Sequence, residues 1–325
     1  MARDDLNRNA EKDALLANVA LLYYGEGLTQ SEIAQRMGVS RPTVVNMLRD
    51  VRERGIVEIR VSGEVLAGSN LSRALRDKFG LADVYVARSR DPEISKPSRE
   101  EVLAQVARVG AMALHDIVQD GDTVGVAWGE TIKAVSLAMT KGDFQGVTVC
   151  QMIGSMVSSR VPTSEDCAIR IAANLGAECY TLHAPAVLSS ERLARELVAE
   201  PTIAAQLDRL KSLDLVVYGV GGINADTHLV AAGIARPQEL QAAIDAGAKA
   251  ILCCRYVDAQ GQALPMAPED RIVAITLDQL RKTPRRLVVM AGKDRLDAAL
   301  AVLRGGLATH LCVDDGLAEL LLATD

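Results

Sequence analysis

The sequence predicts a two-part α/β protein, in which a short helical unit precedes a larger domain built on a parallel β-sheet. Its 325 residues exceed one typical domain and suit two or three. Short helices with clear cap and stop signals dominate the first 55 residues. From about residue 99 onward, candidate strands and helices alternate, which favours a parallel sheet with helices on both faces.

The composition is that of a soluble protein with an aliphatic core. Hydrophobic residues make up 49% of the chain and charged residues 24%, which is typical of globular domains. Because there are only two Phe and one Trp, Ala, Leu, Val and Ile have to fill the core. No apolar run is long enough for a transmembrane helix, and the polar N-terminus is unlike a signal peptide. We therefore expect a cytoplasmic protein without a membrane partner.

Neither the cysteines nor the glycines indicate a cofactor. The six Cys are scattered without a C-x-x-C pair, and the chain has four His, so we expect buried thiols rather than a metal site or disulfides. No turn matches G-x-G-x-x-G or the P-loop, so a nucleotide cofactor is not indicated.

The charge distribution allows binding to nucleic acid despite a net charge of −6. Residues 1–60 are neutral, with nine basic and nine acidic residues, so the rest of the chain carries the excess negative charge. Five basic residues cluster within a stretch of 19 residues: Arg36, Arg41, Arg49, Arg52 and Arg54. A local basic face of this kind can contact phosphates on an otherwise acidic protein.

The first two helices of the N-terminal unit are predicted by apolar spacing and by caps. Apolar residues recur at helical spacing over residues 11–24, and glycines follow. Thr29 and Glu32 then form the pattern of a capping box, which starts a helix over Gln30–Met37. Gly38 ends this helix.

A third helix and a short strand complete the unit. Ser40 is the expected N-cap, and Pro42 falls in the first turn, where a missing N–H costs little. The helix runs to about Arg54 and stops at Gly55. Residues 56–61 (IVEIRV) then alternate between apolar and polar side chains, which predicts a strand and hence a winged-helix-like unit.

Two short capped helices separated by Gly38 and Val39 are typical of a helix-turn-helix, which predicts double-stranded operator DNA as a partner. The second helix would enter the major groove, where Arg prefers guanine and Asn prefers adenine. We expect Met47 to face outward with the polar residues of this helix. The alternative is a three-helix bundle with a solvated basic face. The candidate DNA-contacting residues are Thr29, Gln30, Ser40, Arg41, Thr43, Asn46, Arg49 and Arg52, with Thr29, Gln30 and Arg52 assigned to phosphates.

The remaining chain divides into a connection and a large domain. Residues 62–70 resemble a linker, a helix over 71–79 closes at Gly80, and the charged, Pro-containing stretch 88–98 is a loop. The expected domains are a DNA-binding domain (1–61), a linker with a first helix and strand (62–98), and an effector-binding and oligomerisation domain (99–325).

Strands and helices alternate through the large domain. The strand candidates are 122–128, 146–152, 178–182, 214–218, 249–257, 285–290 and 309–313. The helix candidates are 99–118, 130–140, 164–175, 189–210, 237–246, 292–304 and 315–323.

Glycine-containing turns follow four of the strands, at 128–131, 153–155, 219–222 and 291–295. The carboxyl ends of parallel strands meet at one edge of a sheet, so these turns should converge on one crevice. Exposed N–H groups, a hydroxyl and positive helix ends suit an anionic or hydroxyl-rich ligand. The candidate effector-binding residues are Trp128, Gly129, Glu130, Thr131, Gln151, Gly154, Ser155, Gly219, Gly221, Gly222, Lys293 and Arg295.

Both parts of the chain resemble one family. The stretch from Leu21 to Val61, which contains LTQSEIAQRMGVSRPTVVNML, resembles the N-terminal domain of SorC/DeoR-type sugar-responsive regulators. Residues 65–323 resemble the sugar-binding domain of the SorC family, notably in VGVAWGETI (124–132), VCQMIGSM (149–156), VVYGVGG (216–222) and CRYVDAQG (254–261). The resemblance implies a domain similar in fold to glucosamine-6-phosphate deaminase and ribose-5-phosphate isomerase. It also implies a sugar-phosphate effector and a dimer or tetramer.

Three departures from the family pattern affect the expected ligand. Glu130 stands where the family has a neutral or basic residue, and a carboxylate there would repel a phosphate. Ala250 and Ile251 replace a common Gly-Asp pair, so a polar ligand contact is missing. Arg295 stands for a family Lys, with Lys293 nearby. A sugar phosphate or another anion and a neutral sugar or polyol therefore both stay open as the effector.

The leading hypothesis is an effector-controlled transcription regulator that is not an enzyme. Because one helix-turn-helix reads few base pairs, we expect a homo-oligomer on paired half-sites. The first alternative is a sugar-phosphate isomerase-like or deaminase-like enzyme with an accessory DNA-binding domain. It would need a general base, for which Glu130 is the candidate on a glycine turn. The second alternative is a DNA-binding scaffold whose sensor has lost its ligand.

Overall fold

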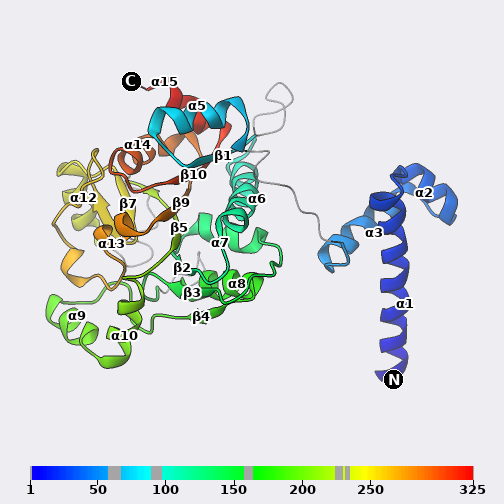
Figure 1. Cartoon of the computed structure of the whole chain (residues 1–325), viewed down its shortest axis with the longest axis horizontal. Helices are drawn as coiled ribbons and strands as arrows, with labels where there is room; N and C mark the ends of the chain where they lie inside the picture. Colours follow the sequence, from blue (N-terminus) through cyan, green and yellow to red (C-terminus); the bar gives the residue numbers. More distant parts are fainter. Residues whose placement is uncertain are drawn as a thin grey trace. The chain divides into compact units, whose positions relative to one another are not determined.

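The computed structural model describes residues 2–57, 67–88, 97–156, 164–223, 230 and 235–324, with side chains from residue 11 onward. The chain divides into two compact units, residues 1–61 and 62–325, which are described separately below (Figure 1). None of the helices within these described ranges has both the length and the hydrophobicity needed to cross a lipid bilayer.

The N-terminal unit is the predicted helical unit. It contains α1 (Ala2–Ala20), a π-helical turn (Leu21–Gly25), α2 (Gln30–Met37) and α3 (Arg41–Glu53). The capping box of Thr29 and Glu32 is present, and the Ser40 side chain accepts a hydrogen bond from the N–H of Thr43. Gly38 adopts a left-handed φ of 64°, which glycine adopts without strain, so α2 can stop abruptly before α3.

A small apolar core joins the three helices of this unit. Val19 and Leu22 pack with Ile33 of α2 and with Val44 and Leu48 of α3, and all five side chains are buried. The predicted outward position of Met47 is wrong, because its flexible side chain lies half-buried between two clusters of this core. In the predicted strand 56–61, Ile56 and Val57 form a bend, and residues 58–61 lie outside the described residues.

Replacing Thr29 with alanine should lower the local stability of α2 by about 1 kcal/mol, since the N-cap hydroxyl accepts a hydrogen bond from the N–H of Glu32. Hydrogen exchange of the α2 amides in the full chain would measure this loss. Thr29→Ser keeps the hydroxyl and serves as the control. Equal exchange in the two variants would contradict the assigned cap.

The same cap has a pH dependence. The hydroxyl and the backbone N–H of Thr29 both donate to the Glu32 carboxylate and lower the pKa of Glu32. The contribution of the carboxylate is therefore complete above its ordinary pKa and is lost as the pH falls through the lowered pKa.

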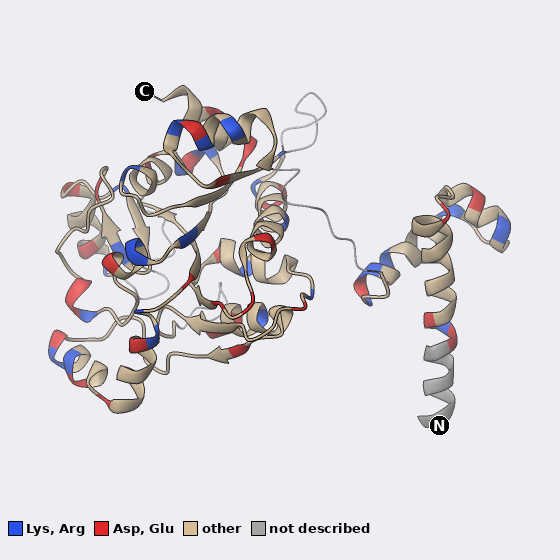
Figure 2. Cartoon of the chain, viewed as in Figure 1, with Lys and Arg blue, Asp and Glu red and all other residues tan. Residues whose placement is uncertain are grey.

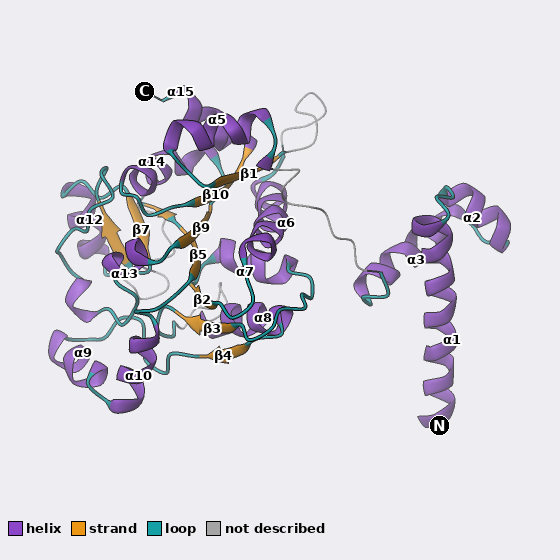
Figure 3. Ribbon diagram, in the orientation of Figure 1, coloured by secondary structure: helices purple, strands orange, loops and turns teal. Residues whose placement is uncertain are grey.

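The second unit is built on a seven-stranded, fully parallel sheet (Figures 1 and 3). In spatial order, the strands are β1 (Asp83–Ala87), β10 (His310–Asp314), β9 (Arg285–Val289), β5 (Leu215–Gly219), β2 (Thr123–Val126), β3 (Thr148–Gln151) and β4 (Glu178–Tyr180). The chain proceeds from β2 through β3 to β4 in one direction, and from β5 through β9 to β10 in the other. The sheet therefore reverses its strand order between β2 and β5, which is where open α/β sheets bind ligands.

Helices cover both faces of this sheet. One apolar cluster includes side chains of α6 (Arg99–Ile117), α7 (Glu130–Ala138) and α8 (Ser164–Leu175). The cluster on the other face includes side chains of α5 (Asn70–Phe79), α13 (Leu277–Lys282), α14 (Leu296–Arg304) and α15 (Asp315–Ala323). Along β5, Leu215 and Val217 belong to the first cluster and Val216 and Tyr218 to the second. This alternation confirms the predicted sheet with helices on both faces.

The prediction of one strand over residues 249–257 is wrong. This segment forms a hairpin of β7 (Ala250–Leu252) and β8 (Arg255–Val257), and β6 (Gly221–Gly222) pairs with β7 to complete a separate antiparallel sheet (Figure 3). The two turn residues, Cys253 and Cys254, both have positive φ, at 48° and 66°. Hairpins of this type usually have Asn-Gly or another Gly-containing turn, so the cysteines concealed the turn in the sequence.

A buried arginine fixes this hairpin to the chain that follows it. Arg255 is 6% exposed, and its guanidinium donates to the carbonyl oxygens of Ala274 and Ile275 and to the carboxylate of Glu269. These bonds satisfy a charge that would be costly to bury alone.

The helix predicted over residues 189–210 is two helices, α9 (Glu191–Val198) and α10 (Pro201–Arg209). The chain breaks at Ala199 and Glu200 because Pro201 has no N–H and disfavours a helical conformation of the residue before it. Farther along the chain, α12 (Pro237–Asp245) also begins with a proline, which suits the first turn.

Candidate functional site

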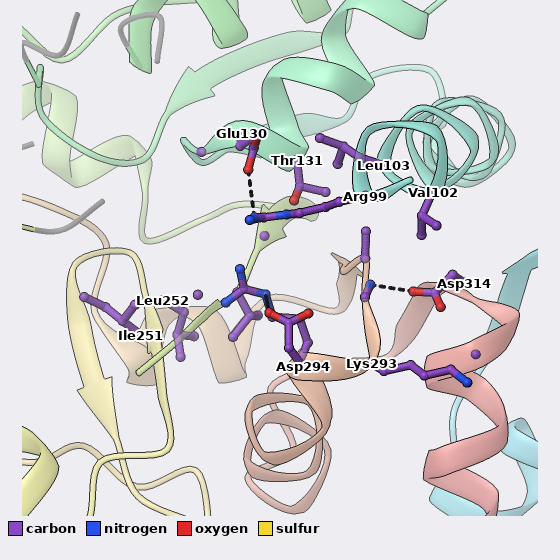
Figure 4. Close-up of a pocket in the computed structure, with 18 of the residues that line it drawn as sticks. Arg99, Val102, Leu103, Glu130, Thr131, Ile251, Leu252, Lys293, Asp294 and Asp314 are labelled. Carbon is purple, nitrogen blue, oxygen red and sulfur yellow. Dashed lines mark hydrogen bonds and ion pairs between the residues drawn. The ribbon is translucent and has the colours of Figure 1, made fainter. Parts of the chain in front are cut away.

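A cavity of about 780 Å³ lies at the carboxyl ends of β2, β5, β9 and β10, beside the point where the strand order reverses (Figure 4). Its volume falls within the range of small-molecule sites. The N-termini of α6, α7 and α15 contribute lining residues, so three positive helix ends border this cavity.

The turn after β2 supplies the first polar wall. Gly129 has a φ of 139°, which strongly favours glycine, and it is the N-cap of α7. This cap has no side chain that could accept the first N–H groups of the helix. Glu130 and Thr131 follow in the first turn of α7, where both line the cavity.

Arg99 approaches this wall from α6. Its Nη2 lies 3.2 Å from Glu130 Oε2, and both side chains are partly open to solvent (Figure 4). Ser98 and Glu101 form a capping box that sets the start of α6 and hence the position of Arg99. The expected repulsion between Glu130 and a phosphate therefore has to be weighed together with Arg99, a cation that lies beside the carboxylate.

The turn after β9 supplies the second polar wall. The N–H of Gly292 donates to Asp314 Oδ2 over 2.6 Å, and the other oxygen of Asp314 accepts from the N–H of Leu317 over 3.0 Å. The buried carboxylate of Asp314 thus joins the turn after β9 to the N-terminus of α15. The Lys293 side chain extends away from Arg99 toward α15 (Figure 4).

Arg295 is the more enclosed cation of this turn. Its side chain is 15% exposed, and its Nε lies 3.6 Å from Asp294 Oδ2. A Cβ on Gly222 would lie 2.8 Å from Arg295 Nη1, so the glycine makes room for the guanidinium. Gly222 therefore acts on the cavity through Arg295 and does not line it.

An apolar wall completes the cavity. Ile251, Leu252, Cys253 and Cys254 line it from the β7–β8 hairpin, and Val102 and Leu103 of α6 line it elsewhere. Burial raises the pKa of both thiols, Cys253 and Cys254, to about 12. Both are therefore neutral at physiological pH and behave as small apolar groups.

Of the twelve residues that the sequence assigned to the effector site, the structure brings eight together in this cavity: Trp128, Gly129, Glu130, Thr131, Gly219, Gly221, Lys293 and Arg295. Four do not line it, although Gly222 contacts a residue that does. The other three, Gln151, Gly154 and Ser155, belong to the turn after β3, of which only Ile153 lines the cavity.

These three residues have structural roles. The buried Gln151 donates to the Ile153 carbonyl and to Ser164 Oγ, and accepts from the N–H of Leu182. A Cβ on Gly154 would lie 2.5 Å from the Ala184 carbonyl oxygen, so this glycine permits two backbone segments to approach closely. The Ser155 hydroxyl donates to the Glu165 carboxylate. Contacts within the protein therefore engage all three residues, and none of them lines the cavity.

Sequence reasoning missed Arg99 and the hairpin. Arg99 directly follows the N-cap Ser98. Its contact with Glu130 could not be recognised in the sequence because the two residues are 31 positions apart. The capping pattern S-R-E-E was a usable signal for a helix end at the cavity.

Most of the candidate DNA-contacting residues belong to α3, along which Figure 2 colours the Arg positions blue. Arg41, Asn46, Arg49 and Arg52 are all exposed on the side away from the core. Arg49 forms a long ion pair with Glu53, at 3.8 Å. Interactions between exposed charges of this kind are weak, so Arg49 stays available to a partner. The Nε of Arg52 donates to the Leu48 carbonyl oxygen within the same helix.

The shorter polar residues are engaged within the unit. The hydroxyls of Ser40 and Thr43 bond to each other over 2.7 Å, and Thr43 and Gln30 are half-buried. The Thr29 hydroxyl belongs to the capping box described above. These residues orient the start of α3 and of α2, where N–H groups face outward.

Comparisons with known proteins match both units. The family described as “Putative sugar-binding domain” matches residues 64–323, and the family described as “MarR family” matches residues 19–65.

Relatives match along the whole length of the chain. The “Uncharacterized transcriptional regulator YjhU” of Escherichia coli (strain K12) is 37% identical over 325 residues, which cover 100% of this chain and 99% of that protein. The deoxyribonucleoside regulator of Bacillus subtilis (strain 168) is 29% identical and covers 96% and 98% of the two chains. The crystal structure of the full-length sorbitol operon regulator SorC from Klebsiella pneumoniae shares the fold, with a TM-score of 0.74 at 24% identity over 95% of this chain and 98% of that one.

Proposed function

Because the chain belongs to the sugar-binding-domain family of transcriptional regulators, we propose that the cavity beside β2 and β5 is its effector site and that α3 is its DNA-recognition helix. One observation supports this proposal most directly: the same chain has both parts that a regulator needs. It has an exposed basic helix within a helix-turn-helix, and a cavity where the strand order of its parallel sheet reverses. Effector binding would shift the population between arrangements that differ in DNA affinity.

The DNA contacts follow from the exposed side chains of α3. Arg41, in the first turn, and Asn46 can reach base edges in the major groove, whereas Arg49 and Arg52 suit phosphates. Ser40, Thr43, Thr29 and Gln30 act by fixing the helix starts. Useful affinity requires paired half-sites, so we propose that the regulator binds DNA as a homo-oligomer.

The effector is a small carbohydrate derivative. This proposal rests on the family and on two relatives, a deoxyribonucleoside regulator and a sorbitol operon regulator. Thr131, the helix N-termini and Arg99 offer donors to hydroxyl or anionic oxygens. An anionic ligand that binds Arg99 would compete with the Glu130 carboxylate for the guanidinium. Ligand binding would then replace the ion pair between Arg99 and Glu130.

A catalytic role has less support than a sensor role. No histidine occurs among the described residues that line the cavity, and the Glu130 carboxylate is paired with Arg99. Asp314 accepts two backbone N–H groups. Because Asp294, Asp315 and Glu319 also line the cavity, the case against catalysis depends on the family and on its regulator relatives. On this basis we propose a non-enzymatic, cytoplasmic regulator.

The purified protein should bind its own upstream DNA with a strong dependence on salt. If it makes six to ten phosphate contacts, affinity should fall by about 10³- to 10⁵-fold between 50 and 200 mM salt. Fluorescence anisotropy with labelled upstream DNA would measure this slope, and a scrambled duplex of equal length gives the non-specific background. Salt-independent binding, or identical affinity for both duplexes, would exclude the regulator proposal.

A true effector should raise the melting temperature and change DNA affinity together. At a hundred times its Kd, a ligand stabilises the protein by about 2.7 kcal/mol, which corresponds to a rise of several degrees for a domain of this size. A thermal-shift screen of sugars, sugar phosphates and polyols would identify it. Arg99→Ala should weaken an anionic effector, whereas Arg192→Ala, an exposed arginine of α9, is the control. A ligand that shifts melting but leaves DNA affinity unchanged would not be the effector.

A further inference from the structure

Helix α3 exposes an apolar side chain among its arginines. Val45 is 43% exposed, whereas Val44 and Leu48 of the same helix are buried in the core of the N-terminal unit. Arg41 lies one helical turn before Val45 and Arg49 one turn after it, and both arginines are exposed. Residues at this spacing share a face of the helix. Val45 therefore lies in a surface stripe that has a guanidinium on either side.

Neither packing nor helix formation accounts for a valine at this position. Val45 belongs to neither of the apolar clusters of the unit. A β-branched side chain also favours a helix less than Ala, Lys or Glu does. A single exposed valine is common on protein surfaces, so its position carries the argument. Val45 lies in the first half of α3, and the N-terminal part of a recognition helix is the part that contacts base edges.

The charges around Val45 favour DNA over a second protein chain as its partner. The flanking arginines complement a phosphate backbone, whereas a symmetric contact with a second copy would bring like charges together. Arg49 has Glu53 as a partner only at 3.8 Å. Among the base edges of the major groove, the apolar group is the 5-methyl of thymine. An apolar side chain between exposed arginines matches this combination of groups.

We propose that Val45 contacts the 5-methyl group of a thymine in each half-site and thereby helps to determine the operator sequence. This inference rests on the proposed role of α3 in DNA recognition, and it adds a third base contact to those of Arg41 and Asn46. Removing one methyl group from water contributes about fourfold to affinity. An oligomer on paired half-sites makes the contact twice, so the total contribution should be about tenfold or more.

Replacing thymidine with deoxyuridine tests this contact, because the exchange removes the 5-methyl group and leaves base pairing intact. Fluorescence anisotropy with the full-length protein would compare the upstream duplex in its thymidine and deoxyuridine forms. The wild type should bind the thymidine form about tenfold more tightly. A scrambled duplex in the same two forms measures the effect of the exchange on non-specific binding. Equal affinity of the wild type for the two upstream duplexes would refute the contact.

Two substitutions assign the methyl sensitivity to Val45. Val45→Ala and Val45→Ser both remove the γ-methyl groups, and each should lose most of the discrimination between the two upstream duplexes. Alanine favours a helix more than valine does, so α3 should keep its fold in the first variant. Leu15→Ala in α1, at a residue that is also 43% exposed, is the matched control and should discriminate as the wild type does. Full discrimination in both Val45 variants would assign the methyl contact to another residue and overturn the proposal.

The remaining outcomes separate this inference from the regulator proposal. If Val45→Ala weakens binding to both upstream duplexes equally and lowers the oligomeric mass in light scattering, Val45 contacts protein and the inference is wrong. If the wild type prefers upstream to scrambled DNA but ignores the methyl group, Val45 has no role in recognition and the regulator proposal stands. If the wild type binds upstream and scrambled DNA equally, both proposals fail.

Discussion

Replacing Arg41 and Asn46 together with alanine should lower affinity for the specific operator by about a hundredfold or more. Each bidentate contact to a base is worth about 1–3 kcal/mol, and an oligomer on paired half-sites loses the contacts at both. The two side chains are exposed on α3, and neither is part of its core. The helix itself should therefore be retained, and the loss should reflect recognition rather than folding.

The measurement compares the double variant on upstream DNA and on a scrambled duplex. Specific binding should fall much more than non-specific binding, so the ratio between the two affinities shrinks. Arg36→Ala removes a charge from α2 in the same unit, where Arg36 pairs with Glu26 over 3.3 Å, and serves as the control. An equal loss on both duplexes would mean that Arg41 and Asn46 contact only phosphates.

The helical unit is predictable from sequence because its signals are local. The capping box at Thr29, the left-handed Gly38 and the N-cap Ser40 all involve contacts within four residues. Neighbours at that range are visible in the sequence, and the structure has the same boundaries for α2. Met47 is the exception, since its burial depends on α1 packing against α3.

The sheet domain shows where local signals stop being sufficient. The glycine turns after β2, β5 and β9 do line one cavity, because parallel strands bring their carboxyl ends together. Gly154 has the same sequence appearance, but its need for glycine comes from the backbone of Ala184, thirty positions away. A glycine required by a ligand and one required by close backbone approach cannot be distinguished without the fold.

The missed residues have the same explanation. Arg99 reaches the cavity because α6 packs beside α7, and the hairpin reaches it because β7 pairs with β6. The Cys253–Cys254 turn contained no Gly, Asn or Asp, so periodicity extended one strand through it. Strained turns that contradict local preference are hard to predict, and they occur often at functional sites.

Asp314→Ala should destabilise the sheet domain by about 2–5 kcal/mol and abolish the response to the effector. The substitution removes the N-cap of α15, worth about 0.5–2 kcal/mol, and a charge-assisted bond to the N–H of Gly292, worth about 1.5–3 kcal/mol. Asp314 is 7% exposed, so water cannot readily replace either bond. Loss of the Gly292 contact would also free the turn that holds Lys293 and Arg295 at the cavity.

A graded series distinguishes this role from a general effect of charge. Asp314→Asn can still cap α15 through its carbonyl oxygen, but its amide would face the N–H of Gly292, donor against donor. In thermal unfolding, the melting temperature of Asp314→Asn should therefore lie between those of the wild type and of Asp314→Ala. The affinity for the effector should fall in the same order. Asp297→Ala, an exposed carboxylate of α14 paired with Lys249, should change stability by no more than about 0.5 kcal/mol. A contrary result would be an equal loss of stability in Asp314→Asn and Asp314→Ala, with effector affinity as in the wild type. Asp314 would then cap α15 without organising the cavity, and the turn after β9 would have no role in ligand binding.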